Sequence, residues 1–313
     1  MTTATAPGRT SSPPGSPGRP TEAKRKRRPM KSPYPTWFFI PAGAFYVVLF
    51  LIPTVASFYF SLTRWTLFDV EFIGIDNFVR FFQEPQLVQG FVNTFIYAFL
   101  TSGTKVVLGL VLGVFLSSQI IGRGFLRSVV FFPVLVSVIG VGILFEVLLD
   151  PFDGPVNGVL AAVGIEGPGW LTDPSLALFS VAMVDVWSGV GLATLIYIAG
   201  MVAIPQEYFE ASKVDGASAW NTFRHVTLPL LRPATVTVVL LSLIGGLRRF
   251  DLIWTMTGGG PGFSSDVLAS VVYKQYQAGF FGLSTAGNVV LFVVVAAIIF
   301  PLSWWLNRKE DDR

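Results

Sequence analysis

Six apolar runs, each long enough to cross a membrane as a helix, constrain this chain more than any other feature. A hydrocarbon core about 30 Å thick needs roughly 20 helical residues to span it. Hydrophobic residues make up 52% of the sequence and charged residues only 13%, which is more apolar than a soluble domain. The sequence therefore predicts an all-α, polytopic membrane protein with a transmembrane domain over residues 36–307 and six spans, near 37–60, 91–119, 128–149, 176–203, 234–256 and 283–306.

The sequence predicts a tail outside the membrane at each end of the chain. Residues 1–35 are rich in Pro, Ser, Gly and Thr and have little to bury, so we expect a disordered N-terminal tail. A signal peptide fits less well, because the apolar run from Trp37 exceeds the usual length. The basic cluster Lys24–Arg28 precedes that run, which favours a membrane-flanking anchor over a nucleic-acid site. Residues 308–313 form a predicted C-terminal tail.

The distribution of Lys and Arg predicts the orientation, because basic residues flanking short loops stay on the cytoplasmic side. With the N-terminus inside, the connections facing the cytoplasm carry most of the positive charge, and those facing outward carry three basic residues. The connection from Asp150 to Asp173 has four acids and no base, as an external loop can. Both termini are then cytoplasmic in the cell membrane, and residues 204–233 form an internal loop. The basic residues on the cytoplasmic side include Arg123, Arg127, Lys213, Arg224, Arg232 and Arg308.

That internal loop has the pattern of two short helices. Pro205 suits the first turn of a helix, a short helix is expected to about Val214, and Gly216 permits a turn before a second helix. Apolar and aromatic side chains recur along the loop although it lies outside the bilayer. They either pack on the chain's own membrane helices or dock into a groove of a partner. These residues are Tyr208, Phe209, Val214, Trp220 and Phe223.

The loop also carries a spaced motif, Glu-Ala-Ala, three residues, Gly, nine residues, Ile, one residue, Leu-Pro. The chain departs from it only by Ser212 for Ala and Val226 for Ile, both conservative in size. It resembles the signature of permease subunits of binding-protein-dependent ABC importers, which implies the type I importer permease fold. The matching positions are Glu210, Ala211, Ser212, Gly216, Val226, Leu228 and Pro229, with Asp215 beside the glycine.

The resemblance implies that this loop is a coupling helix seated in a cleft of a separate ATPase subunit. Glu210 would be its polar anchor and Gly216 its turn. The implied partners are a dimer of ATPase subunits, a second homologous permease and an extracellular solute-binding protein. ATP and Mg would be used by the ATPase, and no cofactor by this chain.

A second segment of the sequence bears on the chemical class of the transported substrate. Residues Phe250 to Pro261 look like the matching segment of carbohydrate-type permeases, such as maltose and glycerol-3-phosphate importers, although a Gly-rich stretch alone is also a plain turn. The resemblance implies a carbohydrate substrate.

No catalytic constellation is visible in the sequence. The glycines at 258–260 lack the Lys that a phosphate-binding loop needs, the only histidine is His225, and the chain has no cysteine. The chain is therefore expected to be no enzyme.

Ionisable residues within the apolar runs are candidates for function, because charge at membrane depth is costly. They are Lys105, Glu146, Asp185, Arg248, Arg249 and Asp251. One reading pairs them with each other or with the second permease. In the other reading, some of these charged residues line a substrate path together with nearby aromatic and polar groups. The residues of that path are Asp185, Trp187, Arg248, Phe250, Asp251, Trp254 and Asn288.

One alternative function stays open at this point. A secondary transporter or channel driven by ion gradients would use Lys105, Glu146 and Asp185 as a relay. It leaves the spaced motif of the loop without a role.

Overall fold

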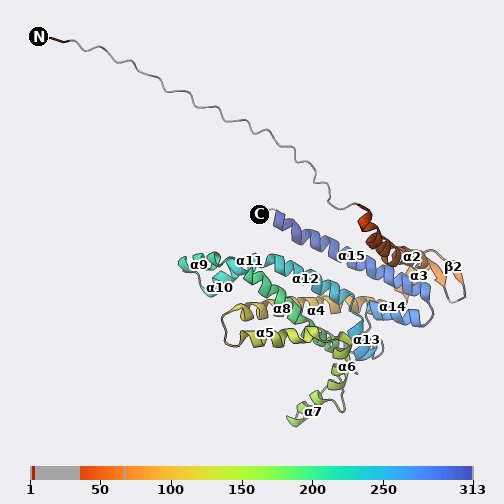
Figure 1. Ribbon diagram of the computed structural model, residues 1–313. Coiled ribbons are helices and arrows are strands. Elements are labelled where there is room, and N and C mark those ends of the chain that lie inside the picture. The colour runs from red at the N-terminus through yellow and green to blue at the C-terminus, as the bar shows by residue number, and fades with distance from the viewer. Residues whose placement is uncertain (1, 4–35, 67, 312–313) are drawn as a thin grey trace.

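The computed structural model describes residues 2–3, 36–66 and 68–311, and it is mainly helical. The tail predicted at 1–35 lies, apart from residues 2–3, outside the described residues. Four helical segments are long and apolar enough to cross a membrane: Trp37–Phe60, α4 (Pro85–Ser117), α8 (Ala177–Val202) and Phe281–Leu306, the last within α15 (Phe281–Asp311). Figure 1 shows α4, α8, α12 and α15 running along the body of the molecule.

Two further apolar helix pairs are sharply bent, and the count reaches six if each pair is one span. Arg123–Leu135 meets Val138–Leu148 at 98°, and Ala219–Leu230 meets Arg232–Leu247 at 65°. The first pair comprises α5 (Arg123–Phe131), η3 (Phe132–Leu135) and α6 (Val138–Leu148). Val136 and Ser137 separate its halves in a non-helical conformation. The architecture of an all-α membrane protein is thus confirmed.

The apolar run expected as a single helix over 234–256 is two helices. Helix α12 (Arg232–Leu247) ends before Arg248, and α13 (Asp251–Thr257) begins three residues later. Two consecutive glycines, Gly245 and Gly246, weaken the last turn of α12, because glycine is a poor helix former. The break has a consequence for the site, since it frees Arg249 to reach across to α8.

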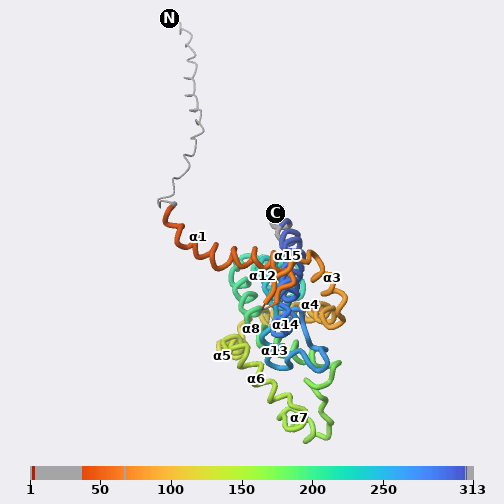
Figure 2. The backbone as a smooth tube through the Cα atoms, turned by 90° about the vertical axis from the view of Figure 1, so that its right-hand side faces the viewer, coloured from red at the N-terminus to blue at the C-terminus, as the bar shows by residue number. Residues whose placement is uncertain are grey.

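The first apolar segment stands apart from the rest. It consists of η1 (Thr36–Phe39), α1 (Ile40–Tyr46), η2 (Val47–Leu51) and α2 (Ile52–Phe60), and none of its residues from Trp37 onward is buried. Figure 2 shows α1 leaving the body of the molecule, while α2 contacts α15. This segment therefore adds little to the core of the chain.

A small hairpin follows that the apolar pattern did not predict. Strands β1 (Thr63–Trp65) and β2 (Val70–Phe72) pair antiparallel, and α3 (Asp76–Gln83) folds back on them. The side-chain amide of Asn77 donates hydrogen bonds to the carbonyl oxygens of Ser61 (2.9 Å) and Thr63 (2.8 Å). Asn77 thus ties α3 to the start of the hairpin through polar bonds, which an apolar pattern does not reveal.

Helices α4 and α8 form the centre of the fold because two glycines let them approach closely. A Cβ atom added at Gly109 would lie 2.7 Å from the Cβ of Ala193, and one at Gly113 would lie 2.7 Å from the Cβ of Tyr197. Glycines four residues apart are the usual means of close packing between membrane helices. The sequence from Gly109 to Gly113 thus sets the spacing of the two central helices.

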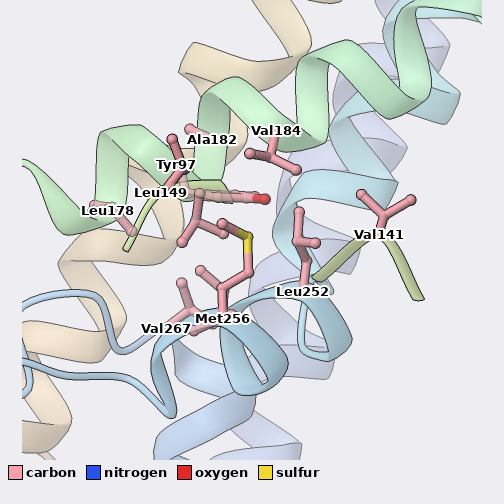
Figure 3. Packing of buried hydrophobic residues seen from close by; sticks show 11 residues of the cluster. Tyr97, Val141, Leu149, Leu178, Ala182, Val184, Leu252, Met256 and Val267 are labelled. Carbon is pink, nitrogen blue, oxygen red and sulfur yellow. The ribbon is translucent and has the colours of Figure 1, made fainter. Parts of the chain in front are cut away.

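The main apolar core lies at one end of these helices. It joins α4, α6, α8, α13 and the segment before α14 (Leu268–Gln277), as the side chains in Figure 3 show. Tyr97, Leu252 and Val181 in this cluster are fully buried. Beyond it, α6 continues into α7 (Pro155–Ala162), which projects from the body in Figures 1 and 2.

Candidate functional site

The 204–233 loop begins with α9 (Gln206–Val214), which ends in a glycine turn. Gly216 has a φ of 71°, in the left-handed region that favours glycine. The amide of Gly216 donates to the carbonyl of Lys213, and that of Ala217 donates to the carbonyl of Ser212. These two bonds form a Schellman motif, in which a glycine terminates a helix. The predicted helix end at Val214 and the turn at Gly216 are confirmed.

The second half of the loop is helical in three pieces: α10 (Ala219–Thr222), the π-helical η4 (Phe223–Thr227) and α11 (Leu228–Leu230). The Ser218 hydroxyl caps α10 by accepting from the amide of Asn221 at 3.3 Å. His225 lies exposed on this surface. Helix α12 follows after a 65° bend, so the loop is joined directly to a candidate membrane helix.

Ser212, one of the two departures from the motif, ties the halves of the loop together. Its side chain is buried, donates to the carbonyl of Phe209 at 2.9 Å and accepts from the hydroxyl of Thr222 at 3.2 Å. An alanine could make neither bond. The substitution therefore gives α9 and α10 a polar link that the alanine of the motif could not form.

The loop has two faces, and its apolar side chains divide between them. Tyr208, Val214 and Trp220 are exposed, Val214 to 88%. Phe209 and Phe223 are partly buried and line a cavity between the loop and the ends of α4 and α8. Phe209 and Phe223 thus face the chain's own membrane helices, and docking into a partner stays a prediction for the three exposed residues. Among the motif positions, Glu210, Ala211, Asp215, Gly216, Leu228 and Pro229 are exposed, and Val226 is partly buried.

A second candidate site is an ion cluster that joins three membrane segments. Asp185 on α8 accepts from the Lys105 ammonium of α4 at 2.7 Å and from the Arg249 guanidinium, in the break after α12, also at 2.7 Å. The side chains of Asp185 and Lys105 are 2% and 6% exposed. The reading that pairs the intramembrane charges with each other holds for these three residues.

A cavity of about 290 Å³ lies beside this cluster. Its walls are largely apolar, from η3, α6, α8 and α12, and its polar side chains converge from separate helices: Lys105, Asp185, Ser188, Ser242 and Arg249. A mainly apolar cavity with a few convergent polar groups is the usual form of a small-molecule site.

The seven residues predicted for a substrate path do not gather in one place. Of them only Asp185 lines this cavity, and Asn288 lines another, between α2 and α15. Phe250 and Trp254 stack at a centroid distance of 5.6 Å, and both contact the ring of Tyr273. Trp187 packs edge-on to Phe145 at 5.1 Å.

Three charged residues within the apolar runs stay outside the cluster. Arg248, Asp251 and Glu146 are exposed and make no ion pair within the described part of the chain. Sequence reasoning marked Lys105 and Arg249 as unusual but did not assign them to the path. It missed Ser188, Ser242 and Tyr273, because a serine or tyrosine in an apolar run gives no signal of its own.

The Gly-rich stretch after α13 is a turn held by side-chain hydrogen bonds. The Thr257 and Ser265 hydroxyls lie 2.8 Å apart, and Ser265 donates to the carbonyl of Gly260 at 2.6 Å. Asp266 accepts from Lys274 at 2.6 Å and from Ser270 at 2.7 Å. Burial raises the pKa of the Asp266 carboxyl above its usual value, against the opposite pull of Lys274 and Ser270. This network fixes the connection between α13 and α14.

Comparison with known proteins places the chain among transporter subunits. Residues 105–309 match the model of the binding-protein-dependent transport system inner membrane component. The chain is 32% identical over 285 residues to the probable ABC transporter permease protein YurN of Bacillus subtilis, covering 88% of this chain and 97% of that protein. It is 32% identical over 275 residues to the trehalose/maltose transport system permease protein MalF of Thermococcus litoralis, covering 87% and 92%.

A solved structure shares the fold. A chain of a bacterial ABC transporter involved in the import of the acidic polysaccharide alginate matches with a TM-score of 0.75 and 22% identity, over 87% of this chain and 94% of that one. The family match begins at Lys105 of the ion cluster, includes the loop and ends within α15. The protein belongs to the family of binding-protein-dependent transport system inner membrane components, as a multi-pass permease of the sugar ABC transporter type.

Proposed function

We propose that this chain translocates a carbohydrate into the cell by alternating access, driven by ATP hydrolysis on a separate ATPase docked at the 204–233 loop. The observation that carries the proposal is the two-faced loop. Its exposed side presents Tyr208, Val214 and Trp220, and its chain continues into α12. A helix held rigidly at both ends transmits a rigid-body movement from a docked partner to the membrane helices.

The partners of this assembly are a dimer of ATPase subunits, which use ATP and Mg, a second homologous permease and an extracellular solute-binding protein. Two relatives support the carbohydrate class: the Thermococcus litoralis permease and the lactose transport system permease protein LacF of Rhizobium radiobacter, 30% identical over 283 residues. Both termini face the cytoplasm in this proposal, and the chain itself binds no cofactor.

The substrate passes the cavity beside the ion cluster. Ser188, Ser242 and the charged groups of Lys105, Asp185 and Arg249 supply hydrogen bonds for hydroxyl groups there. Phe250, Trp254 and Tyr273 form an aromatic cluster next to the break that follows α12, and such faces suit sugar rings. Trp187, Arg248, Asp251 and Asn288 remain candidates along the path.

The test replaces Glu210 with Ala in the complete transporter and measures two quantities, association with the ATPase and uptake of labelled sugar in proteoliposomes. We expect weakened association and reduced ATP-dependent uptake. Unchanged values of both would remove the coupling role of the loop. Uptake by the purified chain alone, without ATP, would instead establish the ion-gradient alternative.

A further inference from the structure

A cavity of about 710 Å³ lies on the inner side of the 204–233 loop, between the loop and the ends of α4 and α8. Ligand sites in proteins commonly have volumes between about 300 and 1,000 Å³. The coupling role proposed above concerns the exposed side of the loop and leaves this cavity unexplained.

The walls of the cavity are mostly apolar. Side chains from the last turn of α4, from the end of α8 and from the loop contribute: Val114, Met201, Val202, Ile204, Phe209 and Phe223. Such a lining suits an acyl chain, because each methylene removed from water contributes about 0.8 kcal/mol.

The polar groups of the cavity favour an anion. Lys213 is the only ionisable residue among the lining residues, all of which lie in the described part of the chain. The Ser117 hydroxyl, also in the lining, is buried and has no hydrogen-bond partner among the described residues. It can donate to an oxygen of a bound group. The lining thus combines one cation, an unpartnered hydroxyl, further polar side chains such as Gln206 and Thr222, and a larger apolar area.

The position of the cavity fits a lipid of the inner leaflet. Ser117 and Val202 end the two central membrane helices, and the basic residues Arg123 and Arg127 follow Ser117 within ten positions. Basic pockets between membrane helices on the cytoplasmic side bind anionic lipid head groups. We infer that this cavity holds an anionic phospholipid, its acyl chain against Phe209 and Phe223 and its phosphate near Lys213 and Ser117.

The lipid has a mechanical role at this place. It fills the space between the loop and the ends of α4 and α8, so that the loop bears on those helices through a packed layer. The inference rests on the cytoplasmic orientation of the loop proposed above, but lipid binding is measured without the ATPase or transport. Its failure is therefore distinguishable from failure of the proposed function.

The experiment is native mass spectrometry of the purified, delipidated full chain, titrated with dioleoylphosphatidylglycerol or dioleoylphosphatidylcholine. We expect one tight site for phosphatidylglycerol and weaker binding of phosphatidylcholine. Lys213→Gln should weaken phosphatidylglycerol binding about fivefold, since one basic residue contributes about 1 kcal/mol to anionic lipid attraction. Arg224→Gln, which alters an exposed base outside the lining, should leave the affinity unchanged.

Two further variants test the location. Ala217→Phe places a ring in the cavity and should abolish the tight site, whereas Ala162→Phe, on the exposed surface of α7, should not. Ser117→Ala removes the unpartnered hydroxyl without adding volume, so it reports on the cavity even if Ala217→Phe fails to fold. Equal affinity for both lipids would overturn the inference. So would a tight site that persists in Ser117→Ala, Lys213→Gln and folded Ala217→Phe, because the lipid would then be bound at the outer surface of the helices.

Discussion

The Lys105 ammonium lies 2.7 Å from one carboxylate oxygen of Asp185, and both side chains are buried between α4 and α8. The other oxygen of Asp185 accepts from Arg249, which belongs to the break after α12. One carboxylate therefore links three membrane segments. Helix α12 begins at the end of the loop and ends just before the break that carries Arg249, so it connects the loop to the cluster.

Asp185→Asn should destabilise the protein strongly, because it leaves the buried Lys105 and the partly buried Arg249 without a negative partner. Breaking a buried pair in this way costs on the order of 3 kcal/mol. Lys105→Met should cost less, since Arg249 still neutralises Asp185. Melting temperatures of the purified variants in detergent measure both effects. Glu146→Gln changes an exposed residue and is the control. A fall in melting temperature for Lys105→Met equal to that for Asp185→Asn would contradict the expected order.

Gly109→Leu should separate α4 from α8, since a Cβ atom at this position meets Ala193 at 2.7 Å. Overpacking of this kind costs about 1–3 kcal/mol. Gly103 on the same helix has no atom within 4 Å of an added Cβ, so Gly103→Leu should have little effect on stability. Thermal unfolding of the two variants makes the comparison, and equal melting temperatures would show that the close approach of α4 and α8 is unimportant.

Gly216→Val should disturb the turn of the loop, because a β-branched residue is strained at a φ of 71°. The left-handed conformation costs a residue with a side chain about 1–2 kcal/mol. Gly216→Asn should retain more function, since asparagine tolerates this region. Affinity for the ATPase and ATP-dependent uptake should fall in the order wild type, Asn, Val. If the valine variant matches the wild type in both assays, the turn is not required for coupling.

The stability of the folded protein should depend on pH through Asp266. Its folded-state pKa is raised by burial, so its contribution to stability is fully present below the usual aspartate pKa of about 4 and is lost as pH rises through the folded-state pKa. The melting temperature of the wild type minus that of Asp266→Asn should therefore decrease from about pH 4 to about pH 7. A difference that rises over this range would reverse the assigned direction of the shift.

The sequence was sufficient for the fold class because membrane spans and the loop motif are local patterns. The runs at 176–203 and 283–306 lie close to α8 and to the apolar part of α15. The bends within the apolar runs could not be predicted from the sequence. The 98° turn at Val136 and Ser137 follows Pro133, which the sequence shows, but prolines also occur in helices that continue. Whether each bent pair crosses the membrane as one span stays a prediction.

Of the two candidate sites, the loop was predictable from the sequence and the ion cluster was not. The turn at Gly216 is set by residues next to it in sequence, so the motif was enough to place it. The cluster of Lys105, Asp185 and Arg249 joins residues 64 to 144 positions apart, and no local pattern shows which charges pair. Three of the flagged charges formed the cluster, and the other three, Glu146, Arg248 and Asp251, did not.

The chain has no cysteine, so one thiol placed at a chosen position can be labelled selectively. A single cysteine at Val214, in the exposed side of the loop, is labelled with a maleimide before and after assembly with the ATPase. We expect protection of Val214→Cys on assembly and none for Phe152→Cys, an exposed residue in the 150–173 connection. Equal labelling of Val214→Cys in the free chain and in a transport-competent complex would show that this loop is not the docking surface.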